Sequence, residues 1–257
     1  MTANAYAKVN IFLKMLGTSG SYHELTSRFI RVDSLFDTIT FVKKEHSDHN
    51  FIIEGDFSCA LEKNSIYKSF LLLIKDGYNP TLQNFFQEHK IVVDKNIPEF
   101  AGLGGGSSNA ATFLRLTNEI VKLGHSREKL ASLGAKIGAD VPFFIYDYPS
   151  ANVSGIGEVV EPFEELPLKI ETFTPDILCD TGKVYKQFRT HYLDTIDIKS
   201  ANTLKKQSSH TLLEQYDAYF LNDLFTPALD LYSDLETYHD SNFFSGSGST
   251  FFKVSHG

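Results

Sequence analysis

The segment Phe100–Thr112, FAGLGGGSSNAAT, constrains the fold more than any other stretch, because it places four glycines within five residues. Glycine has no Cβ, so it adopts positive φ angles and lets a ligand approach the main chain closely. The residues that follow favour a helix over 107–123, and the first N–H groups of a helix lack internal partners and carry the positive end of its dipole. The sequence therefore predicts a glycine loop that leads into a helix and can bind phosphate oxygens.

This loop matches neither of the two common nucleotide-binding motifs. No lysine follows it, as GxxxxGK[ST] requires, and Ser107 stands where GxGxxG has its third glycine. Taken alone, the glycines are equally consistent with a flexible surface turn before a capped helix. Other parts of the chain must therefore decide between a ligand site and a turn.

Composition narrows the class of protein. The chain has 257 residues, 42% of them hydrophobic, which suffices for one large or two modest domains. A net charge of -8 argues against a general electrostatic grip on nucleic acid or on anionic lipid. Cys59 and Cys179 are far apart and form no metal or disulfide pattern, which fits a reducing cytosol. Because no run of about 18 apolar residues occurs, we expect no signal peptide, no transmembrane helix and a cytoplasmic protein.

The spacing of apolar residues, together with the glycine, proline and capping residues between them, predicts both strands and helices along the chain. Pro149–Gly157, rich in serine, glycine and asparagine, is the best candidate for a domain boundary, which divides the chain into residues 1–150 and 151–257. We expect strands over 5–13, 38–42, 91–93, 143–145 and 168–174 and after Ser245–Gly248, and helices over 65–76, over 107–123, from Ser126, from Asp180 and within 209–238.

Two charged residues stand where chemistry is possible. Asp140 lies in a short turn after a predicted helix, where it could point into a cleft or simply stabilise the turn. Lys8 and Asn10 share one face of the first strand, where a lysine is often just solvated. A phosphate loop, a carboxylate that accepts a hydroxyl proton and a lysine that neutralises charge together fit phosphoryl transfer. A nearby lysine would also lower the pKa of Asp140.

Five motifs occur in order along the chain: AYAKVNIFLK at 5–14, SYHEL at 21–25, IPEFAGLGGGSSNAA at 97–111, GADVPFF at 138–144 and SGSGST at 245–250. Together they resemble the GHMP small-molecule kinases over almost the whole chain. The resemblance implies an α+β fold of two domains, with a ribosomal-protein-S5-like N-terminal domain, an α/β C-terminal domain and the active site in the cleft between them.

The resemblance also implies ATP as phosphoryl donor, with Asp140 as the base on the substrate hydroxyl and Lys8 orienting Asp140. Mg²⁺ is inferred only from the charge that must be neutralised, and its ligands are unknown. The residues implied to wrap the ATP phosphates are Pro98, Glu99, Phe100, Ala101, Gly102, Leu103, Gly104, Gly105, Gly106, Ser107 and Ser108.

The resemblance assigns the pair Tyr22-His23 to a cytidine-containing substrate, in which the tyrosine stacks on the cytosine and the histidine reads it by hydrogen bonds. Asn10 is implied to contact the substrate near its reacting end. Thr181 and Tyr185, four residues apart on a predicted helix, and Phe29 complete the implied pocket. The implied substrate is a cytidine-diphosphate-linked methylerythritol, phosphorylated at its C2 hydroxyl in the non-mevalonate route to isoprenoid precursors. We expect a monomer or weak homodimer that binds neither nucleic acid nor membrane.

Three alternatives stay open. The chain could be a GHMP kinase for a mevalonate-type, homoserine or sugar substrate, or a non-catalytic nucleotide-binding relative, although the latter has no chemical need for Lys8 and Asp140. A nucleic-acid protein is disfavoured by the acidic charge. Two departures from the family pattern are Thr18–Ser21, where an Arg-x-Asp-Gly stretch is common, and Asn109, where an aspartate is common.

Overall fold

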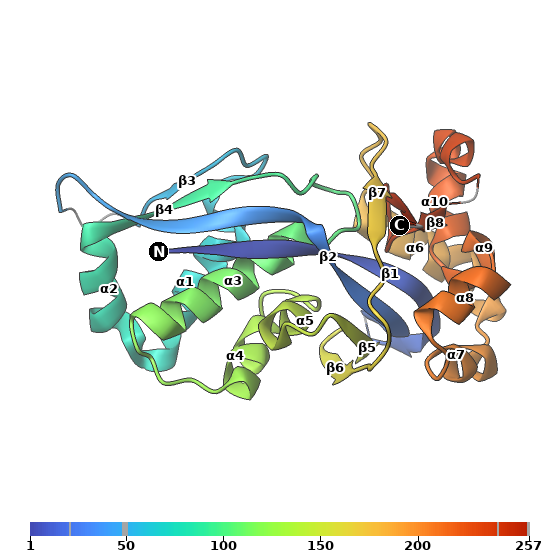
Figure 1. The fold of residues 1–257 in the computed structure, drawn as a ribbon, viewed down its shortest axis with the longest axis horizontal. Helices are drawn as coiled ribbons and strands as arrows, with labels where there is room; N and C mark the ends of the chain where they lie inside the picture. The colour runs from blue at the N-terminus through green and yellow to red at the C-terminus, as the bar shows by residue number, and fades with distance from the viewer. Residues whose placement is uncertain (21, 48–50, 241, 256–257) are drawn as a thin grey trace. The chain divides into compact units, whose positions relative to one another are not determined.

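The computed structural model describes residues 1–20, 22–47, 51–240 and 242–255, and the side chains of Ser19, Tyr22 and Asn79 also lie outside the described part. The chain forms two compact units. Two long strands, β1 (Thr2–Ser19) and β2 (Tyr22–Lys43), contribute residues to both (Figure 1). The predicted division between residues 150 and 151 stays a prediction. Unit 1 consists of residues 1–7, 35–99 and 105–147, and unit 2 of residues 8–34, 100–104 and 148–257.

The sheet of unit 1 is built on the second half of β2. There β4 (His89–Asp94) pairs antiparallel with β2, with Thr38 opposite Asp94, and the short β3 (Ile53–Glu54) pairs parallel with β4. Ile91 and Val93 are buried and alternate with more exposed residues, as expected for a sheet with one covered face. The predicted strands over 38–42 and 91–93 are confirmed.

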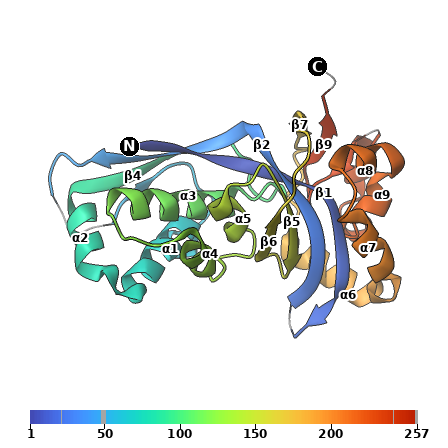
Figure 2. The ribbon, with the colours of Figure 1, turned by 60° about the horizontal axis from the view of Figure 1, so that its bottom comes forward.

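Local capping chemistry sets the helix starts of unit 1. Asn64 caps α1 (Ser65–Leu73) by accepting a hydrogen bond from the N–H of Ile66, and Ser126 caps α4 (Arg127–Gly134) in the same way. The helix after the glycine loop, α3, begins at Gly105 rather than at Ser107. Helices α1 and α3 lie on one side of the strands of this unit (Figures 1 and 2). The remaining helical segments of unit 1 are the 3₁₀ turn Leu61–Lys63, the π-turn Ile74–Tyr78, α2 (Asn79–Glu88) and α3 (Gly105–Ile120).

The prediction of a strand over 143–145 is wrong, because Val141–Tyr146 forms a helix, α5. Pro142 lies in its first turn, where the missing N–H of proline costs no hydrogen bond. Every residue from 141 to 145 is buried, and α5 packs against α3 and α4. A short, wholly buried apolar run has no periodicity that separates strand from helix, and here the proline favours the helix.

In unit 2, the first half of β2 pairs antiparallel with β5 (Ser150–Gly155), with Leu25 opposite Gly155, and β5 pairs with β6 (Val159–Pro162). The stretch 149–157, predicted as a domain boundary, thus contains a paired strand. A second sheet has the order β7-β9-β8, which confirms the strand within 168–174 and the final strand. Its strands are β7 (Ile170–Phe173), β8 (Phe243–Phe244) and β9 (Phe251–Val254).

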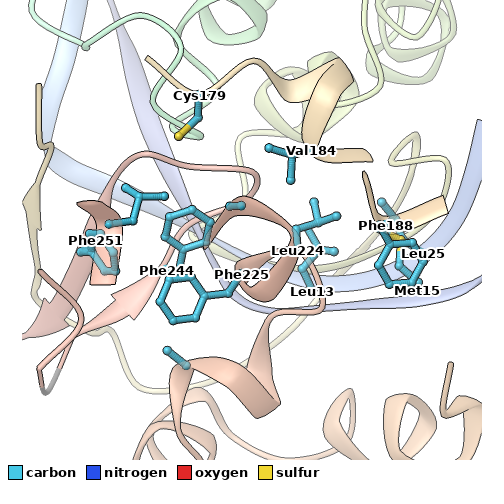
Figure 3. Packing of buried hydrophobic residues seen from close by; sticks show 13 residues of the cluster. Leu13, Met15, Leu25, Cys179, Val184, Phe188, Leu224, Phe225, Phe244 and Phe251 are labelled. Carbon is cyan, nitrogen blue, oxygen red and sulfur yellow. The ribbon is translucent and has the colours of Figure 1, made fainter. Parts of the chain in front are cut away.

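The helices of unit 2 cover an apolar cluster that includes Leu13, Val184, Phe225 and Phe244 (Figure 3). Asp180 caps the first of these helices, as predicted, by accepting from the N–H of Lys183. No described helix combines the length and apolar character needed to cross a membrane. The helices are α6 (Thr181–His191), α7 (Ile198–Leu204), α8 (Ser209–Gln215), α9 (Ala218–Leu221) and α10 (Phe225–Leu231), with 3₁₀ turns at Leu193–Thr195 and Ser233–Tyr238.

The buried Arg28 of β2 forms hydrogen bonds and an ion pair with other segments of unit 2. The Arg28 guanidinium donates to Oδ1 of Asn152 at 2.7 Å and to the carbonyl oxygen of Lys205 at 2.8 Å, and lies 3.6 Å from a carboxylate oxygen of Glu165. Its Cζ stacks 3.3 Å from the ring centroid of Phe163. Burial lowers the pKa of Arg28 to about 10, an effect that Glu165 opposes, so the group stays charged at neutral pH.

We predict that Arg28→Met lowers the free energy of unfolding by about 3–5 kcal/mol, because it leaves the Glu165 carboxylate buried without its cation. The matched control is Arg31→Met on the same strand, where the partner Asp33 is 69% exposed. That change should cost at most about 1 kcal/mol. Urea unfolding of both variants measures the difference, and equal losses would contradict the anchoring role of Arg28.

Candidate active site

The first strand places Lys8 and Asn10 together, and both are buried, at 3% and 2% exposure. Nζ of Lys8 donates to Oδ1 of Asn10 at 2.5 Å and to the carbonyl oxygen of Gly102 at 2.9 Å. It also lies 4.7 Å from the ring centroid of Phe29, within cation–π range. The alternative of a solvated lysine is therefore wrong, and three of the predicted site residues, Lys8, Asn10 and Phe29, come together in unit 2.

The turn around Gly102 leaves no room for a side chain. Gly102 has a φ of +71°, and a Cβ there would lie 2.2 Å from the carbonyl oxygen of Ser245. Oγ of Ser245 donates to the Gly102 carbonyl at 3.0 Å, so that carbonyl accepts from both Ser245 and Lys8. The backbone N–H of Lys8 bonds the next carbonyl, that of Leu103. The glycine loop and the second glycine turn after β8 thus meet at Lys8.

Residues 105–108 belong to unit 1 and form the first turn of α3. A Cβ on Gly105 would lie 3.0 Å from Cγ2 of Ile97, whereas a Cβ on Gly106 would have Oγ of Ser65, at 3.8 Å, as its nearest neighbour. Gly106 is exposed at the start of the helix, and a Cβ there would make only an ordinary van der Waals contact. This arrangement fits the oxygens of a phosphate group.

The chain that leads into the glycine loop is held by Asp37, which the sequence analysis missed. Its fully buried carboxylate accepts from the N–H groups of Asn96 and Ile97, at 2.7 and 2.8 Å, and from Nζ of Lys95. The sequence offers no distinctive signal for this role, because β2 also contains the acidic residues Glu24 and Asp33. These bonds fix the segment just before Pro98 in unit 1.

Asp140 stands at the N-terminal boundary of α5, but in the described part of the chain its side chain does not cap that helix. Asp140 is therefore not a side-chain cap of α5, and whether it stabilises the turn or acts in a cleft stays a prediction. The preceding turn runs beside the start of α3, since a Cβ on Gly138 would lie 3.5 Å from Oγ of Ser107. Asp140 belongs to unit 1 and Lys8 to unit 2, so their pairing stays a prediction.

His23 lies against the aromatic face of α6. Its ring centroid is 5.2 Å from that of Tyr185 and 6.0 Å from that of Phe188. Nε2 of His23 is buried and has no hydrogen-bond partner among the described residues. Burial, and then the charge of Arg189, lower the pKa of His23, so the ring is neutral at pH 7. Tyr22 begins β2, but its side chain lies outside the described part of the chain.

Thr181 contacts the second glycine turn of the unit. Its Oγ1 lies 2.8 Å from Oγ of Ser247, and Tyr185 follows one helical turn later on α6. Ser245 and Ser247 were predicted only as part of the motif at 245–250, with no individual role. In the structure, Ser247 hydrogen-bonds Thr181, and Ser245 donates to the Gly102 carbonyl.

Metal ligation was left open by the sequence. In the described ranges, no group of three or more His, Cys, Asp or Glu side chains could hold a metal ion. Mg²⁺ in phosphoryl-transfer sites is commonly held by one or two carboxylates together with the phosphates of the nucleotide. The described residues are compatible with that mode, and Mg²⁺ stays a prediction.

Comparisons with known proteins agree with this geometry. Residues 64–148 match the model of the GHMP kinases N terminal domain. A 4-diphosphocytidyl-2-C-methyl-D-erythritol kinase of Sulfurimonas denitrificans is 51% identical over 97% of this chain and 95% of its own, and one of a Sulfurovum species is 52% identical over 98% of both. A crystal structure of a 4-(cytidine 5'-diphospho)-2C-methyl-D-erythritol kinase, 27% identical, superposes with a TM-score of 0.77 over 100% of this chain and 91% of that one. The chain therefore belongs to the 4-diphosphocytidyl-2-C-methyl-D-erythritol kinase family of the GHMP kinases.

Proposed function

We propose that the protein transfers the γ-phosphoryl group of ATP to the C2 hydroxyl of 4-diphosphocytidyl-2-C-methyl-D-erythritol and releases the 2-phosphate and ADP. The observation that carries this proposal is the buried Lys8 ammonium, held by Asn10 and Gly102 within the motif that the resemblance assigns to catalysis. The names of relatives about half identical over nearly the whole chain support the choice of substrate.

The residues from Pro98 to Ser108 would bind the ATP phosphates. The first-turn N–H groups of α3 offer donors and the positive end of a helix dipole, and Gly106 leaves the approach to them open. Bound ATP supplies the phosphoryl group, and Mg²⁺ on its phosphates would neutralise part of their charge.

Asp140 would accept the proton of the C2 hydroxyl as that oxygen forms its bond to phosphorus. Lys8 would orient Asp140 and stabilise negative charge on the transferred oxygens, since the Lys8 ammonium is preorganised by two acceptors in a buried place. Asn10, bonded to Lys8, would contact the substrate near the same hydroxyl.

Cytosine recognition would centre on His23. A neutral imidazole has one nitrogen that donates and one that accepts, so the unpaired Nε2 can form a hydrogen bond with the base. Tyr185 and Phe188 hold the imidazole ring in place. Tyr22 would stack on the cytosine, and Thr181 and Phe29 would complete the pocket.

We predict that ADP release with Mg-ATP is rapid only when the cytidine-diphosphate methylerythritol is the acceptor, and that Asp140→Asn lowers kcat by a factor of about a hundred or more, as expected for the loss of a general base. Mevalonate, homoserine and sugar alcohols complete the acceptor panel. The matched control is Asp147→Asn, an acidic residue at the other end of α5 that pairs with Arg115.

Turnover of a different alcohol would support kinase activity but contradict the assignment of the cytidine pocket. ATP binding without turnover of any acceptor would favour the alternative of a non-catalytic relative. Equal losses in the Asp140 and Asp147 variants would contradict the assignment of Asp140 as base.

We predict that replacement of Gly102 and of Gly106 by alanine has opposite effects on stability. Gly106→Ala should keep or slightly raise stability, by up to about 1 kcal/mol, because alanine favours a helix, and should raise KM for ATP by covering the open helix start. Gly102→Ala should destabilise the fold by more than about 1 kcal/mol through its positive φ and the clash with Ser245. Thermal unfolding and ATP titration of both variants measure these effects. An unchanged KM for ATP in Gly106→Ala would contradict the assignment of the start of α3 to the ATP site.

The lowered pKa of His23 has a consequence for acid stability. In the folded protein this pKa lies below its ordinary value of 6.5, so as pH falls through about 6.5 the unfolded chain binds the proton first and stability is lost. His23→Gln should therefore lose less unfolding free energy than wild type between about pH 7.5 and pH 5. The control is His210→Gln, an exposed histidine paired with Glu214. Urea unfolding at several pH values measures this dependence. If the unfolding free energy changes with pH equally in wild type and His23→Gln, the lowered pKa of His23 is contradicted.

A further inference from the structure

Ser27 is a fully buried serine on β2, between His23 and Phe29 on the same face of the strand. Oγ of Ser27 accepts a hydrogen bond from Nδ2 of Asn10 at 2.9 Å. We propose that Ser27 is a positioning residue, which fixes the orientation of the Asn10 amide and through it holds the Lys8 ammonium. This inference rests on the proposed phosphoryl transfer, in which Lys8 and Asn10 take part.

The number of protons that each group can donate fixes the orientation of the Asn10 amide. A serine hydroxyl has one proton, and Ser27 donates it to the backbone carbonyl of Phe12. The Ser27 oxygen can then only accept. The Asn10 amide must therefore turn its NH₂ group towards Ser27, which directs Oδ1 to Nζ of Lys8.

The opposite orientation of the amide is unfavourable at both ends. Oδ1 would face the Ser27 oxygen with no proton between them, and the NH₂ group would face an ammonium, which only donates. Both mismatches would occur in a buried place, where an unpaired polar group is costly. The backbone also encloses the amide, because Gly246 approaches so closely that a Cβ there would lie 3.3 Å from Oδ1 of Asn10.

Loss of the Ser27 hydroxyl would remove this constraint. The Asn10 amide could then rotate, and Lys8 would lose an acceptor while it kept the Gly102 carbonyl. A small displacement of a charge-stabilising group lowers the rate of the chemical step more than it weakens binding of remote parts of the substrates. The α3 helix start, which would bind the ATP phosphates, does not involve Ser27, so binding of ATP should change little.

The test compares Ser27→Ala with Ser27→Thr, which keeps the hydroxyl. Ser27→Ala should lower kcat about tenfold, as expected for one hydrogen bond in a buried network, with KM for ATP within about twofold of wild type. Ser27→Thr should restore most of kcat. Ser209→Ala, which removes another fully buried hydroxyl of unit 2, is the control and should lower stability while it leaves kcat unchanged.

A double-mutant cycle separates positioning from general destabilisation. In an Asn10→Ala background, Ser27→Ala should cause no further loss of kcat, because the amide it orients is gone. An unchanged kcat in Ser27→Ala, an undiminished effect in the Asn10→Ala background, or a Ser27→Thr variant as slow as Ser27→Ala would each overturn the proposal. Should Ser27→Ala not fold, Ser27→Cys replaces it, since a thiol is a weak donor and acceptor of similar shape.

A readout that needs no turnover distinguishes failure of this inference from failure of the proposed function. The side-chain amide protons of Asn10, observed by NMR, should exchange slowly with solvent in wild type and Ser27→Thr and at least about tenfold faster in Ser27→Ala, because they lose their acceptor. Equal exchange rates would overturn the inference even in an active kinase. If the amide protons of Asn10 are protected but the protein phosphorylates none of the alcohols, the result would support the inference about Asn10 and contradict the proposed function.

Discussion

The site of unit 2 depends on one constraint, the burial of the Lys8 ammonium. A charge removed from water needs acceptors that replace its hydration, and here they come from the Asn10 amide, the Gly102 carbonyl and the face of the Phe29 ring. These groups belong to β1, to the glycine loop and to β2. The three segments must therefore keep their places for the charge to be tolerated, and a glycine at 102 is the condition for the close approach of Ser245.

Features whose partners are close in sequence were predictable. Asn64, Ser126 and Asp180 cap helices by accepting N–H groups two or three residues ahead, so the local sequence contains both partners of each bond. The family was also predictable, because five ordered motifs carry far more information than one glycine loop. The family model and the relatives confirm that assignment.

Features that depend on distant partners were not predictable. The run 143–145 contains only apolar residues, whose pattern does not separate strand from helix, and the helix that Pro142 favours is buried against α3 and α4. Ser27 and Asp37 belong to no motif, and their roles come from bonds to Asn10, Asn96 and Ile97, which lie 17 to 60 positions away in the chain. The roles of Asp140, Tyr22 and Mg²⁺ remain predictions, of which the Asp140→Asn variant tests the first.

Arg28 has a consequence for the alignment of β2 with its neighbours. Side chains alternate along a strand, so the face opposite to Arg28 carries Ser27 and Phe29. A slip of β2 by one residue would move the guanidinium to the side of Lys8 and strip it of Asn152, Lys205 and Glu165. Two cations would then share a buried region, and the Glu165 carboxylate would lose the cation beside it. The arginine thus disfavours a slip of β2 by one residue and stabilises the alignment that brings Ser27 and Phe29 to the side of Lys8.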